Sequence, residues 1–111
     1  MSRRIDATSL QLLLDRAQEV VGFARGRNLD DLRTDRMLGL AIQQLLVMIG
    51  VGARRLPLGL RNAHPEVSWR EIMETGDALI VDYDEVEIET VWRTATEDIP
   101  KLVATFERLL P

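Results

Sequence analysis

The chain has 111 residues, which is enough for one domain around a single hydrophobic core, and its 46% apolar content excludes a disordered protein. A formal net charge of -4 argues against a dedicated non-specific nucleic-acid binder, because such proteins are usually basic. There is no cysteine, and His64 is the single histidine, so the sequence predicts neither a disulfide framework nor a metal site.

Two further signals concern where the protein works. The N-terminal Ser2-Arg3-Arg4 is not followed by the apolar run of a signal peptide. No apolar stretch reaches the roughly 20 residues that are needed to span a bilayer. We therefore expect a cytoplasmic protein that makes no contact with a membrane.

The first helix is predicted over residues 6–26, where apolar side chains recur at helical spacing. Asp6, Thr8 or Ser9 could cap it, and Gly26 fits its C-terminal stop. Residues 27–33 then form a connector with one helical turn at 29–32.

A second helix is predicted over residues 34–56, with Thr34 or Asp35 as its cap. Its middle, residues 38–51, is apolar almost all round, and such a helix is usually buried from several sides. In a domain of this size, that pattern predicts a helix at the centre of a bundle that also contributes to a subunit contact. Residues 57–67 follow as a loop or short-turn region that contains His64.

The third helix is predicted over residues 68–82 and the last over residues 86–110. Ser68 and Glu71 have the spacing of a capping box at the start of the third helix. Pro100 lies inside the apolar stripe of the last helix and should kink it without ending it, because the stripe continues in phase. With no strand signal, the sequence predicts an all-α antiparallel bundle of four to five helices that spans residues 1–111 as one domain.

The stretch SWREIMETGDALIVDY, residues 68–83, resembles the signature helix of the HepT-like family of HEPN ribonuclease toxins. The resemblance extends over nearly the whole chain, through FARGRNLDDL (23–32), HPEVSWREI (64–72) and TEDIP (96–100). It implies the HEPN-type helical bundle, a homodimer, and RNA cleavage without a metal or other cofactor. It also implies a toxin–antitoxin module in which a nucleotidyltransferase antitoxin attaches AMP to the tyrosine of the motif.

The family motif is Arg-(four residues)-His-x-Tyr, and on this chain it falls on Gly76, Val81 and Tyr83. The resemblance assigns the arginine to the scissile phosphate and the histidine to proton transfer. Only the tyrosine is present, as a possible acceptor for AMP. The plain structural alternative for Tyr83 is an aromatic ring at the end of a bundle helix with its hydroxyl in water. Asp77 stands where the family often has Asn or Asp, and a free surface carboxylate is its plain alternative.

Other polar positions of the family groove also differ here. Val51 stands where glutamate is expected, Gly52 where alanine is expected, and Val47 where an acidic residue is often found. Loss of these groups predicts a roomier and drier groove that could hold a small apolar ligand. The residues expected to line it are Val47, Val51, Gly52, Gly76, Ile80 and Val81.

Three hypotheses follow from these residues. The first is a catalytically impaired HepT-like toxin homologue that keeps the dimer and the antitoxin contact. The alternative is a groove that has been remodelled, naturally or by engineering, to bind a small molecule or to host a new activity. The third, an intact toxin that uses other groups, is disfavoured by the single histidine.

We expect Tyr83 at the mouth of a cavity lined by Gly76 and Val81, because helical spacing from Gly76 to Tyr83 would put them on one face.

Overall fold

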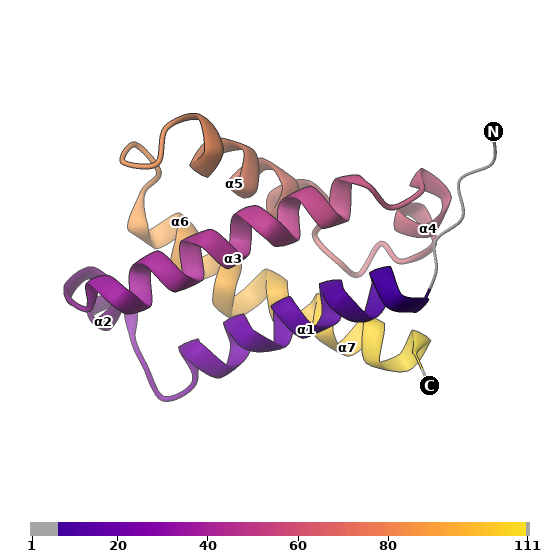
Figure 1. Ribbon diagram of the computed structural model, residues 1–111, viewed down its shortest axis with the longest axis horizontal. Helices are drawn as coiled ribbons and strands as arrows, with labels where there is room; N and C mark the ends of the chain where they lie inside the picture. Colours follow the sequence, from indigo (N-terminus) through magenta and orange to yellow (C-terminus); the bar gives the residue numbers. More distant parts are fainter. Residues whose placement is uncertain (1–6, 111) are drawn as a thin grey trace.

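The computed structural model describes residues 7–110, and every regular element in that part of the chain is helical (Figure 1). The all-α prediction is therefore confirmed. The elements are α1 (Ala7–Ala24), α2 (Leu29–Thr34), α3 (Arg36–Arg54), α4 (Leu58–Ala63), α5 (Trp69–Val81), α6 (Ile88–Arg93), η1 (Thr94–Asp98) and α7 (Ile99–Leu109).

Helix α3 lies between α1 and α5 and makes its most extensive contact with α5 (Figure 1). Helix α7 packs along α1, and η1 touches both α1 and α5, so the last part of the chain closes the bundle. The core between them is apolar, with Ile42, Leu46, Ile49, Leu102 and Phe106 among its fully buried side chains. The predicted arrangement of four main helices, with the second at the centre, is present.

Helix α3 is long and apolar enough, by length and composition alone, to cross a membrane. This differs from the expectation that no apolar stretch would reach that length. The position of α3 accounts for its composition: one face packs on α1 and the other on α5. An apolar central helix of a bundle passes the same test of length and hydropathy.

The last predicted helix is continuous from Ile88 to Leu109 but contains the π-helical turn η1. The Ile99 amide donates to the carbonyl of Thr94, five residues earlier, directly before Pro100. Because proline has no amide hydrogen and its ring clashes with the carbonyl four residues back, the wider turn accommodates it. Pro100 thus leaves the helix unbroken, as predicted, and the π-turn is the local change.

The capping box predicted at the start of α5 is wrong. Ser68 precedes α5, but its side chain makes no capping bond to the helix, so the predicted capping box with Glu71 does not form. The Ser68 side chain instead hydrogen-bonds Asp98. Residues 57–67, predicted as a loop or short-turn region, contain α4, a helix of six residues that starts after Pro57.

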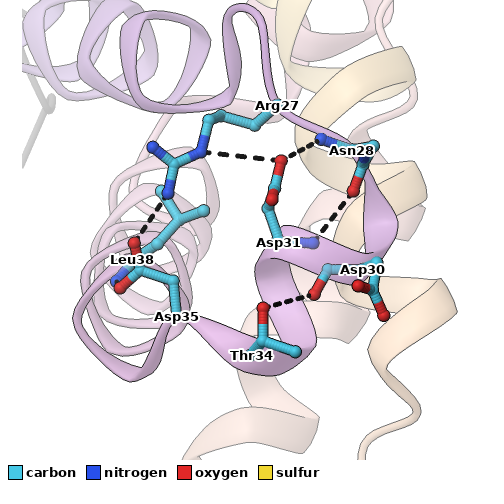
Figure 2. Close-up of polar contacts among 7 residues, drawn as sticks. All are labelled: Arg27, Asn28, Asp30, Asp31, Thr34, Asp35 and Leu38. Carbon is cyan, nitrogen blue, oxygen red and sulfur yellow. Dashed lines mark hydrogen bonds and ion pairs between the residues drawn. The ribbon is translucent and has the colours of Figure 1, made fainter.

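A capping box does form elsewhere, at the start of α2 (Figure 2). The Asn28 side chain accepts from the Asp31 amide, and the Asp31 carboxylate accepts from the Asn28 amide, both at 2.9 Å. Asp35 then caps α3 as predicted, accepting from the Leu38 amide at 3.1 Å. Gly26 ends the preceding turn with a φ of +73°, which fits its predicted role as the stop after α1. The predicted caps Thr8 and Ser9 lie inside α1, and Asp6 lies outside the described residues.

Candidate functional site

Gly76, at the motif's arginine position, lies buried where α5 crosses α3. A Cβ added to Gly76 would lie 3.2 Å from the Cα of Gly50 and 3.2 Å from the carbonyl oxygen of Leu46. Backbone atoms of α3 therefore already occupy the space that the first side-chain atom at position 76 would need. Because position 76 has no side chain, α3 and α5 pack closely there. The roomier groove expected beside Gly76 is therefore not found.

Apolar side chains lie exposed on the outer sides of α3 and α5. Val81, at the motif's histidine position, is 84% exposed, and its neighbour Ile80 is 58% exposed. On α3, Leu40 and Val51 are exposed and Val47 is partly buried, and their spacing of seven and four residues follows one side of the helix. We call these five residues the α3–α5 apolar face.

Gly52 is separate from the α3–α5 apolar face, because it faces α1. A Cβ on Gly52 would lie 3.1 Å from Cδ1 of Leu13, a buried α1 residue. The glycine thus lets α1 approach α3. The predicted lining residues Gly52 and Gly76 therefore serve two different helix contacts.

Tyr83 lies beyond the end of α5, which stops at Val81. Asp82 has an extended backbone (φ -149°, ψ 91°), so helical spacing does not continue to Tyr83. The expectation that Tyr83 shares a helical face with Gly76 is wrong for this reason. Tyr83 instead lines a hollow of about 370 Å³, between α2, α3 and the segment that leads into α6.

Neither Gly76 nor Val81 lines this hollow, which we call the Tyr83 hollow. Its polar lining comes from Arg33 of α2, Arg36 and Gln43 of α3, and Tyr83 and Asp84 of the α5–α6 segment, and its apolar lining includes Leu32, Val86 and Ile88. Burial raises the pKa of the Tyr83 hydroxyl, although the nearby charge of Arg36 acts in the opposite direction. At neutral pH Tyr83 is therefore a neutral hydroxyl that can donate or accept a hydrogen bond.

Asp77, predicted as a weaker candidate, forms an ion pair with Arg54 at 2.5 Å across the α3–α5 contact. Both side chains are about half exposed, at 55% and 54%. His64 lies at the end of α4, with its Nδ1 3.5 Å from a Glu66 carboxylate oxygen. Within residues 7–110 no group of three His, Cys, Asp or Glu side chains could hold a metal ion.

The sequence reasoning missed Arg36 and Gln43. They are seven residues apart on α3, which puts them on the same side of the helix two turns apart, and this spacing was a usable signal. What periodicity alone could not supply is that the chain after Val81 turns back to bring Tyr83 beside them.

Comparison with known proteins gives a consistent result. The family model described as "Ribonuclease HepT-like" matches residues 13–109. A protein of Thermococcus cleftensis named "Probable ribonuclease HepT" is 34% identical over 87 residues, covering 78% of this chain and 79% of its own. A protein of Caldanaerobacter subterraneus, provisionally named as an RNase, is 29% identical over 101 residues, covering 91% of this chain and 90% of its own. No solved structure matches the chain.

Proposed function

The chain belongs to the family of HepT-like ribonucleases, and we propose that it is a member that keeps the fold but has lost RNA cleavage at the family's motif. The observation that carries this proposal is the pair of residues at positions 76 and 81. Gly76 has no side chain and packs on Gly50, and Val81 presents only methyl groups to solvent. Neither can neutralise a phosphate or transfer a proton, the two roles that the motif implies.

Other polar side chains do not replace the missing groups within one copy of the chain. His64 precedes α5, whereas Val81 ends it, and the 13 residues of α5 separate the two positions by about 18 Å along the helix axis. Asp77 is already engaged by the fold, because its carboxylate forms an ion pair with Arg54. These two observations support impaired cleavage over an intact ribonuclease that uses other residues.

The test is an RNA-cleavage assay that compares the native protein with a Gly76→Arg/Val81→His double variant and a Val81→Ala control. We expect background cleavage from the native protein and the control, and a gain of activity in the double variant. A native rate equal to that of the double variant would show that cleavage does not depend on these positions. The arginine must begin 3.2 Å from Gly50, so circular dichroism should first confirm that the double variant folds.

We also propose that two copies associate through the α3–α5 apolar face. Val81 and Ile80 are large aliphatic side chains exposed by more than half of their surface, and Leu40 and Val51 extend the same apolar character along α3. Large aliphatic side chains exposed to this extent are typical of protein–protein contacts. Light scattering should give twice the 12.6 kDa monomer mass, and Val81→Glu should shift it towards the monomer. A native protein that is monomeric at micromolar concentration would exclude this assembly.

The family resemblance further supports a role in a toxin–antitoxin module with a nucleotidyltransferase as partner. Tyr83 would accept AMP on its hydroxyl, and the transfer chemistry would come from the partner enzyme. Co-expression with such an enzyme should add the mass of one AMP unit to the native chain and none to Tyr83→Phe. A modified Tyr83→Phe variant would place the acceptor elsewhere.

The alternative of an emptied groove that holds a small apolar ligand receives less support. Close packing of Gly50 fills the space beside Gly76, where the sequence predicted the greatest loss of volume. The exposed aliphatic residues Ile80 and Val81 fit a contact between copies better, because a ligand pocket should bury most of its occupant's surface.

A further inference from the structure

A small hollow lies where the end of α1 meets the π-turn η1 and the start of α7. Its volume is about 200 Å³, and the residues that line it are Val21, Ala24, Arg25, Ala95, Thr96 and Pro100. Four of these six residues carry only aliphatic carbon in their side chains, so the wall is mainly apolar. We call it the π-turn hollow. None of its residues lines the Tyr83 hollow or belongs to the α3–α5 apolar face.

The π-turn leaves a backbone acceptor in this wall. In a regular α-helix the Thr96 carbonyl would accept from the amide four residues later, but that residue is Pro100, which has no amide hydrogen. The Thr96 hydroxyl is already engaged, since it donates to the Trp92 carbonyl at 2.7 Å. Turns of the π type recur at functional sites. The Thr96 carbonyl therefore lacks its regular helical donor at a place where a ligand can supply one.

Arg25 adds a positive charge to the wall on the side of α1. It directly follows the last residue of α1 and is exposed. No carboxylate of residues 7–110 lies within ion-pairing distance of its guanidinium, whereas Arg27, two residues later, pairs with both Asp31 and Asp35. A guanidinium binds a carboxylate through two parallel N–H donors. The charge of Arg25 is thus available to a carboxylate ligand.

We propose that the π-turn hollow binds a free aliphatic α-amino acid. The carboxylate of the ligand pairs with Arg25, and its ammonium group donates to the Thr96 carbonyl. The aliphatic side chain lies against the apolar wall formed by Val21, Ala24 and Pro100. A volume of about 200 Å³ is below the roughly 300–1,000 Å³ of sites for drug-sized molecules, which limits the ligand to this small size. The site shares no residue with the family motif, so it is independent of the proposed loss of cleavage.

All three parts of an aliphatic amino acid are needed for this fit. An amine without a carboxylate would bring a second positive charge beside Arg25, and like charges repel. A carboxylate with an acylated nitrogen would offer the Thr96 carbonyl only a neutral donor, which bonds more weakly than an ammonium group. The aliphatic side chain supplies buried apolar surface, because exposed ion pairs alone contribute little to affinity.

The experiment is a titration of the ¹⁵N-labelled full chain with leucine, followed by amide chemical shifts. We expect shifts of the Arg25 and Thr96 amides, and tighter binding of leucine than of glycine, which has no side chain to bury. Arg25→Ala should weaken leucine binding by about tenfold or more. Arg55→Ala is the matched control, because Arg55 is also exposed and without an ion pair but lies at the end of α3, away from the hollow. It should leave the affinity unchanged.

A second variant tests the position of the aliphatic side chain. Ala24→Leu places a large side chain in the hollow and should abolish leucine binding, and circular dichroism should show that the variant keeps the native helix content. A folded Ala24→Leu variant that binds leucine as tightly as the native protein would exclude the hollow as the site.

Two leucine derivatives separate a free amino acid from the end of a protein chain. N-acetylleucine mimics a C-terminal residue, and leucinamide mimics an N-terminal residue. We expect both to bind more weakly than leucine. The proposal is overturned if either derivative binds as tightly as leucine, if leucine produces no shifts at millimolar concentration, or if Arg25→Ala binds leucine as tightly as the native protein.

Discussion

Gly50 of α3 and Gly76 of α5 meet backbone to backbone, so that a Cβ added to either would lie 3.2 Å from the Cα of the other. Glycine in the middle of a helix costs about 1 kcal/mol in propensity relative to alanine. Both helices have a glycine at this contact, and the missing side chains allow α3 and α5 to approach closely. The contact is thus a reason for glycine at position 76 that is independent of catalysis.

Substitution of Gly76 by alanine should destabilise the protein. The methyl group would force α3 and α5 apart by a few tenths of an ångström, and overpacking of this kind costs about 1–3 kcal/mol, against a gain of up to about 1 kcal/mol in helix propensity. Urea unfolding measures the difference. Gly22→Ala is the matched control: Gly22 lies inside α1 with nothing within 4 Å of its added Cβ, so we expect it to stabilise by about 0.5–1 kcal/mol. Equal effects of the two substitutions would contradict the close-contact argument.

The sequence predicted the long elements well because their apolar periodicity reports directly which faces are buried. The central position of α3, the cap at Asp35 and the stop at Gly26 all agree with the structure. Pro100 was also interpreted correctly as a residue that the helix passes through. These features depend on residues close together in the chain, and local propensity and spacing determine them.

Removal of the Asp35 side chain should weaken the junction of α2 and α3 (Figure 2). Its carboxylate caps α3 through the Leu38 amide and also forms an ion pair with Arg27 at 2.6 Å. We expect Asp35→Ala to lower the free energy of unfolding by about 1 kcal/mol, a typical cost for loss of an N-cap. Asp30→Ala, on the exposed side of α2, is the matched control and should cost clearly less. A loss no larger than that of the control would show that the cap contributes little.

The site was harder to predict because it depends on contacts between distant residues. The close approach of Gly50 and Gly76 involves two helices, and no pattern around Gly76 alone distinguishes a filled space from an empty one. Tyr83 was placed on the face of α5 because helical spacing was extended past the predicted helix end at residue 82, whereas α5 ends at Val81. The extended backbone of Asp82 turns the chain away from the helix axis, so spacing counted along α5 assigned Tyr83 to the wrong neighbours.

The stabilising contribution of Glu66 should be lost in acid. Its pKa is lowered by a hydrogen bond from its own backbone amide and by one from the Thr105 hydroxyl, at 2.9 Å, with further help from the charges of His64 and Arg108. Because the folded state holds the proton less tightly, this contribution is present above the ordinary value of 4.5 and is lost as the pH falls through the lowered folded pKa. Glu66→Gln should therefore be less stable than the native protein at pH 7, and this difference should shrink as the pH falls below 4.5. Glu74→Gln, at an exposed position of α5, is the control and should cost less stability at pH 7 than Glu66→Gln.

Asp98 should have the opposite dependence on pH. It is buried in the π-turn η1, one of its oxygens has no hydrogen-bond partner, and burial is the main cause that raises its pKa above the ordinary value of 3.8, against a smaller opposing effect of the Ser68 hydrogen bond. Since the folded state holds this proton more tightly than the unfolded state, its contribution to stability falls as the pH rises through 3.8 towards the raised folded pKa. Asp98→Asn keeps an oxygen that can accept from Ser68 but carries no charge. We therefore expect the stability of the variant, relative to the native protein, to improve between pH 3 and pH 7.

Thermal unfolding of the native protein and of Asp98→Asn between pH 3 and pH 7 measures this difference. Subtracting one stability from the other removes the contributions of Glu66 and Asp35, which both proteins share. Asp98→Ala separates the charge from the hydrogen bond. It should follow the same trend with pH but lie about 1 kcal/mol lower throughout, because the Ser68 hydroxyl loses its acceptor. If Asp98→Asn instead becomes relatively less stable as the pH rises, the ionised carboxylate is favoured in the fold. In that case Arg93 and Lys101, whose charges lower the pKa of Asp98, would outweigh its burial.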